Sequence, residues 1–257
     1  MPAVPKPAAT VILVRDAPRL EVFLQRRVAG MAFAGGMTVF PGGGVAPQDR
    51  VPTSWQGAPA SWFAERLACD DELATAFVRA AVRETFEECG VLLAGPGTTS
   101  ARERKALVRQ QRTLDEVLAA AGLTVRADLL RPWARWITPE ISPKRYDTAF
   151  FVAAVPEGQE ADARTTEAVE ATWWSPAEAL AGAARGELSL MAPTLTAVRE
   201  LAEQPDTAAV LAAADLRRIV PITPRVVRGG AWPTLTITDA DGAVHTVTDH
   251  DPRQAAR

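Results

Sequence analysis

The sequence predicts an α/β (α+β) protein that ends in a β-hairpin. Apolar runs typical of strands are mixed with helical patterns along most of the chain, which indicates a mixed sheet with helices packed on it. Capping residues mark several helix ends. Two alternating segments near the C-terminus flank a turn-forming stretch. The length of 257 residues allows one large domain or two small ones, with a sizeable core in either case.

The N-terminal part is expected to form a strand pair. Residues 8–14 and 20–24 are apolar runs joined by a turn at residues 16–18, so two short strands are predicted. A glycine-rich stretch follows at residues 30–45. Residues 46–60 contain several prolines, and we expect them to form an exposed loop.

A long helix is predicted in the middle of the first half. Asp70 suits the N-cap position of a helix over residues 71–89. Gly90 is expected to end this helix, because glycine takes the left-handed conformation at helix C-termini without a steric penalty. A capping box of Thr113 and Glu116 predicts a second, shorter helix that ends near residue 122.

The rest of the chain continues this mixture. Further helices are predicted at residues 61–67, 101–111, 193–203 and 207–218. Ser175, with proline after it and glutamate three positions later, predicts another helix start. Further strands are predicted at residues 135–138, 145–155 and 172–174. A hairpin is predicted from residues 234–238 and 243–248, around a turn at 239–242.

Composition excludes several function classes. The net charge of −3 argues against a broad basic surface for nucleic acid. No apolar run reaches the roughly 18 residues that a membrane-spanning helix needs. Prolines stand where a secretion signal would carry its apolar core. Cys69 and Cys89 do not make a disulfide framework. We therefore expect a cytoplasmic protein with no membrane or nucleic-acid partner.

The predicted helix over residues 71–89 carries acidic side chains close together. At 100° per residue, Glu84, Glu87 and Glu88 fall within roughly 100° of arc, opposite an apolar side. Three like charges on one face repel each other, and a bound divalent cation would reverse that effect. Such a face is more often only solvated surface. It gains meaning from the upstream glycines at residues 42–44, whose backbone can approach a ligand closely.

Together these two segments resemble the Nudix box. That motif runs Gly, five residues, Glu, seven residues, then Arg-Glu-aliphatic-any-Glu-Glu-any-Gly-aliphatic. Residues 83–91 match the second half, except for Thr85 at an aliphatic position. Gly43 opens the first half, which brings Asp49 to the glutamate position. The 33 residues between Asp49 and Arg83 (50–82) replace the usual seven, and such a surface insertion costs little closure entropy.

The long insertion resembles one Nudix branch, which includes a peroxisomal coenzyme A diphosphatase of animals. The resemblance implies a Nudix-type mixed sheet sandwiched between helices over residues 5–228. It also implies insertions at about residues 50–76 and 98–130. Residues 229–257 would form the hairpin and tail.

The same resemblance implies a set of site residues. Mg²⁺ or Mn²⁺ would be held by Glu84, Glu88, Glu87 and the Gly43 backbone. Glu84, Arg83 and Glu87 would be catalytic, and Arg26, Gly42 and Gly43 would bind substrate. The general base stays open among Glu84, Glu140, Glu167 and Glu170. Aromatic side chains that would stack on adenine or belong to the core are Trp133, Trp136, Tyr146 and Phe150. Arg27 is a further candidate for a substrate phosphate. Cys89 lies on the apolar side and is expected only to pack.

The implied function is metal-dependent hydrolysis of a phosphoanhydride bond in a nucleoside-diphosphate-linked compound. Coenzyme A or acyl-coenzyme A is the first substrate to consider, and ADP-ribose or a dinucleotide is the alternative. A Nudix-like binding module without catalysis is a third possibility. A homodimer is expected, because an exposed edge of the hairpin offers a pairing surface.

Overall fold

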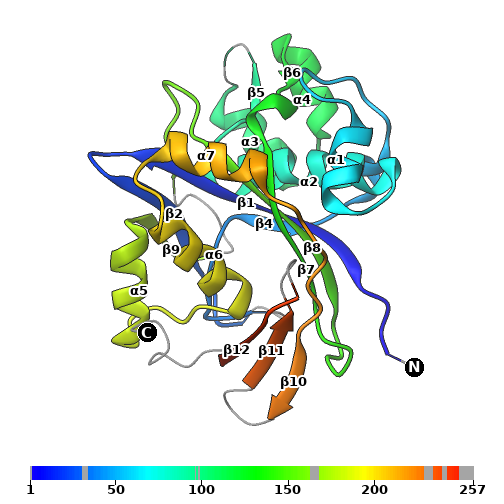
Figure 1. Cartoon of the computed structure of the whole chain (residues 1–257). Helices are drawn as coiled ribbons and strands as arrows, with labels where there is room; N and C mark the ends of the chain where they lie inside the picture. Colours follow the sequence, from blue (N-terminus) through cyan, green and yellow to red (C-terminus); the bar gives the residue numbers. More distant parts are fainter. Residues whose placement is uncertain are drawn as a thin grey trace.

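The computed structural model describes residues 2–30, 34–95, 97, 99–162, 168–228, 234–238 and 242–248. A mixed sheet forms its centre, with strand order β3-β2-β1-β8-β7, and with β4 pairing β1 and β9 pairing β2 (Figure 1). The strands are β1 (Lys6–Asp16), β2 (Leu20–Arg27), β3 (Thr38–Val39), β4 (Gly42–Gly44), β7 (Arg131–Ile137), β8 (Tyr146–Ala154) and β9 (Ala168–Trp174). Strands β1 and β8 are parallel, and the other pairs are antiparallel.

Strand β1 is buried on both faces and divides the core into two clusters. Ala9, Val11 and Leu13 face one cluster, and Ile12 and Val14 face the other, as the two-residue period of a strand requires. The first cluster lies under α1 (Ala60–Leu67), α2 (Asp71–Cys89), α3 (Ala101–Val108) and α4 (Leu114–Ala121). The second lies under α5 (Pro176–Ala184), α6 (Ala192–Ala202) and α7 (Thr207–Leu216). The predicted sheet sandwiched between helices is confirmed (Figure 1).

Helix ends set by local capping residues fall where the sequence predicts them. The Asp70 side chain accepts a hydrogen bond from the Leu73 N–H, and Gly90 ends α2 with φ of 76°. The Thr113 capping box opens α4. Helix α3 stops at Val108, three residues before its predicted end, because Gln110 takes a left-handed conformation with φ of 55°.

Several boundaries depend on pairing and differ from the prediction. Strand β7 begins at Arg131, four residues early, because a register shift between Pro132 and Ala134 accommodates the proline. Strands β2 and β9 are also longer than predicted, since they pair with each other over most of their length. Four elements were not predicted because they are too short to show a periodic pattern. They are β5 (Ala94–Gly95), β6 (Thr124–Val125) and the 3-10 helices η1 (Pro47–Arg50) and η2 (Ala127–Leu129).

The expected exposed loop at residues 46–60 is wrong at one position. Asp49, within η1, is fully buried. Its carboxylate accepts hydrogen bonds from the Ala46 N–H and from Arg83, which satisfy a charge that would otherwise be costly to bury.

The C-terminal hairpin is present and larger than predicted. Strands β11 (Thr234–Thr238) and β12 (Val244–Thr248) pair antiparallel, and β10 (Arg225–Arg228) adds a third strand. Its turn at residues 239–241 and the tail at 249–257 lie outside the described residues. The division into residues 5–228 and 229–257 stays a prediction.

The described residues contain no helix that is long and apolar enough to cross a membrane.

Candidate functional site

The C-terminal half of α2 carries the acidic site. Exposure of the carboxylate side chains differs: Glu84 is 13% exposed and Glu87 is 21% exposed, whereas Glu88 as a residue is 4% exposed. The opposite side of the helix packs into the first cluster. Thr85 is fully buried, and its hydroxyl donates to the Ala81 carbonyl oxygen one turn earlier in the helix. Thr85 therefore fits an aliphatic position without an unsatisfied polar group.

The Arg83 side chain of α2 connects this helix with β4 and η1, from which the insertion separates it in sequence. Its guanidinium donates to the Asp49 carboxylate at 2.8 Å and to the Gly44 carbonyl oxygen at 2.8 Å. It also donates to Glu84 at 2.7 Å and lies 3.5 Å from Glu87. The aspartate at the usual glutamate position thus reaches its partner despite the missing methylene, because η1 brings its backbone close to α2.

The glycines of β4 lie directly against the acids. Gly43 pairs with Ala9 of β1, and a Cβ at Gly43 would lie 2.5 Å from the Glu84 carboxylate. A Cβ at Gly42 would lie 2.4 Å from the Ala9 carbonyl oxygen. Gly43 needs to be glycine because α2 approaches β4 so closely, and Gly42 because β1 does. Gly44 has open space where a Cβ would stand.

Glu88 is held by two donors. The Gly42 N–H donates to its carboxylate at 2.8 Å, and the Gln25 side-chain amide of β2 makes a short hydrogen bond to the same oxygen. Burial, and after it the charge of Glu84, raises the pKa of Glu88 to about 8. Burial likewise raises the pKa of Glu84 to about 7, which Arg83 opposes. Two carboxylates thus lie close together where ionising both is unfavourable.

The donor set fits a hard divalent cation, although its carboxylates do not converge. Among the described residues, no three His, Cys, Asp or Glu side chains are arranged to hold a metal ion. Glu84 and Glu87 face Arg83, while Glu88 faces Gln25 and Gly42. Two observations fit a cation: the repulsion between two buried carboxylates, and the buried Gln25 Oε1, to which no described group donates.

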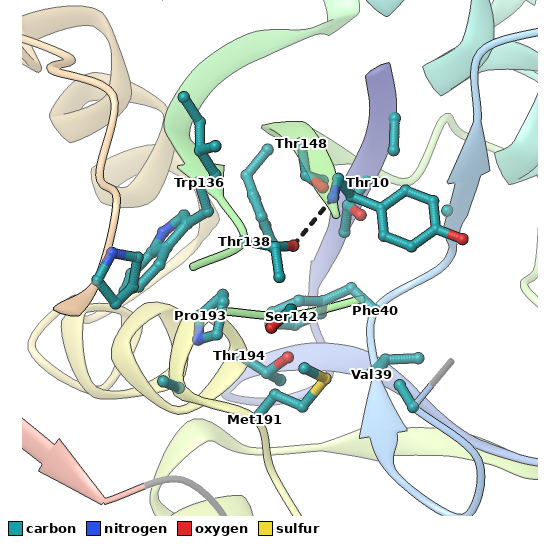
Figure 2. A pocket seen from close by; sticks show the side chains of 18 of the residues that line it. Thr10, Val39, Phe40, Trp136, Thr138, Ser142, Thr148, Met191, Pro193 and Thr194 are labelled. Carbon is teal, nitrogen blue, oxygen red and sulfur yellow. Dashed lines mark hydrogen bonds between the residues drawn. The ribbon is translucent and has the colours of Figure 1, made fainter. Parts of the chain in front are cut away.

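A cavity of about 490 Å³ opens beside the glycine turn. Glu84 and Arg27 contribute the charged side chains among its described lining residues, together with the backbone of β4. The rest of the lining is apolar or bears hydroxyls. In Figure 2, Trp136 of β7, Thr138 directly after β7 and Thr148 of β8 lie above Met191, Pro193 and Thr194 at the start of α6. The Thr138 hydroxyl accepts a hydrogen bond from the Tyr146 N–H at 3.0 Å.

The predicted aromatic residues divide between cavity and core. Trp136, Tyr146 and Phe150 line the cavity. Trp133 is buried in the second cluster, where its indole N–H donates to Glu200. Trp133 and Trp136 face the same cluster, although they are three residues apart, because the register shift in β7 lies between them and changes the strand's phase at Ala134.

The other predicted residues lie at various distances from this cavity. Arg26 is half-exposed and pairs with Glu170, also exposed, on the neighbouring strand β9. Arg27 lines the cavity, and its charge lowers the pKa of Glu88. Glu140 is exposed, and neither it nor Glu170 is among the described lining residues. Glu167 lies outside the described residues.

Cys89 is confirmed as a packing residue. It is fully buried, its thiol donates to the Thr85 carbonyl oxygen, and burial raises its pKa to about 12.

Two buried side chains at the site were not foreseen from the sequence. Gln25 contacts Glu88 but lies in an apolar strand with no local motif around it. Arg104 of α3 donates to the Glu87 carbonyl oxygen at the C-terminal end of α2 and pairs with Asp162 at 2.7 Å. Only the tertiary fold brings either residue to the acidic helix.

Comparisons with known proteins identify relatives of this chain. The family model described as the NUDT19 Nudix domain matches residues 58–201. The putative nudix hydrolase 7 of Caenorhabditis elegans is 30% identical over 205 residues, covering 77% of this chain and 61% of that protein. The acyl-coenzyme A diphosphatase NUDT19 of Homo sapiens is 31% identical over 193 residues, covering 66% and 48% respectively. The chain therefore spans only part of the length of these curated relatives.

A solved Nudix structure is similar to this chain over most of the length of both proteins. The crystal structure of a NUDIX hydrolase from Alicyclobacillus acidocaldarius aligns with a TM-score of 0.68 and 28% identity. The alignment covers 82% of this chain and 96% of that one.

Proposed function

Because the chain belongs to the NUDT19-type Nudix hydrolase family, we propose that it hydrolyses the phosphoanhydride bond of a nucleoside-diphosphate-linked compound with the help of Mg²⁺ or Mn²⁺. Coenzyme A and its acyl derivatives are the proposed substrates, in line with the name of the human relative. The observation that carries the proposal is the pair of buried carboxylates, Glu84 and Glu88, beside a glycine turn that opens into a cavity.

Each residue has a distinct task in this proposal. Glu84 and Glu88, with Glu87 and the Gly43 carbonyl oxygen, would hold the cation. When bound, the cation supplies positive charge that polarises the phosphoryl oxygens and stabilises the leaving phosphate. Arg83 orients Glu84 through its 2.7 Å hydrogen bond, and Asp49 fixes Arg83 in turn. The side-chain-free turn leaves room for the diphosphate next to these groups.

Proton transfer is proposed for Glu84. It is the acidic side chain among the described lining residues of the cavity, and it lies against the glycine turn beside which the diphosphate would bind. Glu140 and Glu170 are exposed on the outside and are less suited to reach a bound substrate.

A substrate panel tests the function. Wild type and Glu88→Gln are assayed with Mg²⁺ or Mn²⁺ on coenzyme A, acyl-coenzyme A, ADP-ribose and a dinucleotide. We expect coenzyme A compounds to be cleaved best. The variant should lose about a hundredfold or more in kcat/KM, since metal positioning contributes several kcal/mol to the transition state. Glu72→Gln, an exposed position on the same helix, serves as the control. Equal turnover by Glu88→Gln would remove Glu88 from the mechanism, and faster cleavage of ADP-ribose would redirect the substrate assignment.

A further inference from the structure

The C-terminal strands form part of the cavity wall. Pro224, Val226 and Leu235 line it, although they are far in sequence from the acidic helix. Strands β10 and β11, which carry Val226 and Leu235, pair with each other, so this wall is a small sheet. It lies beside β7 in Figure 1.

This wall is fixed to the main fold. The Ile137 N–H donates to the Ile222 carbonyl oxygen at 2.8 Å, and the Ile222 N–H donates to the Arg135 carbonyl oxygen at 2.8 Å. The segment that leads into β10 therefore continues the hydrogen bonding of β7. Leu235 and Ile237 are buried in the second core cluster. The wall is thus held in place by backbone hydrogen bonds and by apolar packing.

The cavity has two chemically different ends. Glu84, the glycines of β4 and Arg27, whose charge acts on Glu88, mark a charged end. Strand β4 is separated from β7 by β1 and β8, and the C-terminal segment pairs with the far edge of β7. Trp136 on β7, with Val226 and Leu235 on the C-terminal strands, makes this other end apolar, and the described lining there contributes no charged side chain. A phosphate group buried at that end would lose its hydration without a cation to compensate.

We propose that the wall made by β10 and β11 receives the uncharged arm of the substrate, and that Leu235 sets how large that arm can be. This inference rests on the proposed function, which places the diphosphate at the charged end. In coenzyme A the diphosphate joins an adenosine that bears a further phosphate to an uncharged pantetheine arm, which carries the acyl chain in acyl derivatives. The apolar end suits the pantetheine and acyl arm, and the phosphorylated adenosine lies toward the charged end.

Two variants of Leu235 and a matched control test the wall. Ile237 lies on the same strand and side, is similarly buried and is not among the described lining residues, so Ile237→Ala reproduces the loss of packing alone. The ratio of kcat/KM for a long-chain to a short-chain acyl-coenzyme A is measured. Leu235→Ala should raise this ratio and Leu235→Phe should lower it, each by about tenfold, which is typical of small size changes in an apolar pocket. Ile237→Ala should leave the ratio as in wild type.

Dephospho-coenzyme A tests where the phosphorylated adenosine half of the substrate binds. The Leu235 variants should affect it as they affect coenzyme A, because the phosphate that distinguishes the two compounds lies away from the wall. An unchanged chain-length ratio in both Leu235 variants would overturn the proposal, as would an equal shift in Ile237→Ala. A response of the Leu235 variants that depends on that phosphate would also overturn it.

A binding measurement separates this inference from the proposed function. Calorimetric affinities of acyl-phosphopantetheines of different chain length need no turnover. One outcome is that wild type cleaves no diphosphate while its affinity still depends on acyl-chain length and changes in the Leu235 variants. In that case hydrolysis is rejected, and the role of the wall in binding the arm is retained. If cleavage occurs but neither rate nor affinity depends on Leu235, the wall is rejected and hydrolysis is retained.

Discussion

At the scale of single residues, Gly43 and Gly44 differ sharply in what surrounds them. A Cβ at Gly43 would displace the Glu84 carboxylate, whereas Gly44 has open space and no strained φ. Gly43→Ala should therefore lower kcat/KM by about a hundredfold, because a misplacement of about 1 Å has that effect on catalytic groups. The melting temperature of this variant should stay close to that of wild type, because the displaced atoms are the terminal carboxylate atoms of the Glu84 side chain. Gly44→Ala should lose much less activity, because its Cβ would meet no protein atom, and equal losses in both variants would refute the close contact with Glu84.

The buried carboxylates also predict how stability responds to pH. Glu84 and Glu88 have pKa values raised from 4.5 to about 7 and about 8, so the folded protein binds these protons more tightly than the unfolded chain. Their contribution to stability is fully present below pH 4.5 and is lost as pH rises through 7 to 8. In the presence of a chelator, the melting temperature should fall more steeply between pH 6 and 8.5 in wild type than in Glu88→Gln. Parallel curves would show that Glu88 is already ionised without cost.

The site residues that the sequence predicts are those that belong to the motif. Glu84, Glu88, Gly43 and Arg83 could be placed together from the sequence because their spacing resembles a known box. Gln25 could not, because nothing in an apolar strand distinguishes an amide that supports a site from one that faces solvent. The closeness of Glu88 to Gln25 arises from how α2 packs over the sheet, which no local pattern encodes.

At the scale of elements, α3 supports the end of α2. Arg104 donates to the Glu87 carbonyl oxygen, one of the carbonyls that a helix leaves unpaired at its C-terminus, and it is largely buried. Arg104→Ala should lower the free energy of unfolding by about 1–3 kcal/mol, because a buried acceptor and Asp162 lose their partner. Arg102→Ala, at an exposed position of α3, should change it little. Urea unfolding measures both, and equal values would remove this role from α3.

Element boundaries were predictable where side chains cap the helix locally. The ends of α2 and α4 follow from Asp70, Gly90 and Thr113, each of which acts on its own helix. Strand ends were less predictable because pairing partners decide them. The register shift in β7 and the third C-terminal strand depend on contacts with distant segments, and the sequence alone carries only weak signals for either.

At the scale of the whole molecule, β1 joins the two core clusters. Adjacent residues Ile12 and Leu13 are fully buried on opposite faces, so the clusters share one strand and should unfold together. Ile12→Ala and Leu13→Ala should each cost about 2–5 kcal/mol and shift one common transition. Tryptophan fluorescence and far-UV circular dichroism should give the same midpoint. Two transitions, each shifted by only one of the variants, would contradict this coupling.

Glu84 and Glu88 are proposed to form a cation site, and Mn²⁺ binding tests that site most directly. Free Mn²⁺ is measured by electron paramagnetic resonance with wild type, the Glu84→Gln/Glu88→Gln double variant and the exposed control Glu72→Gln. We predict that wild type and the control bind Mn²⁺ equally. The double variant should bind it at least tenfold more weakly, because loss of even a hydrogen-bonding partner of a metal ligand typically weakens binding by about 10–100-fold. Binding by the double variant with wild-type affinity would show that Glu84 and Glu88 do not hold the cation.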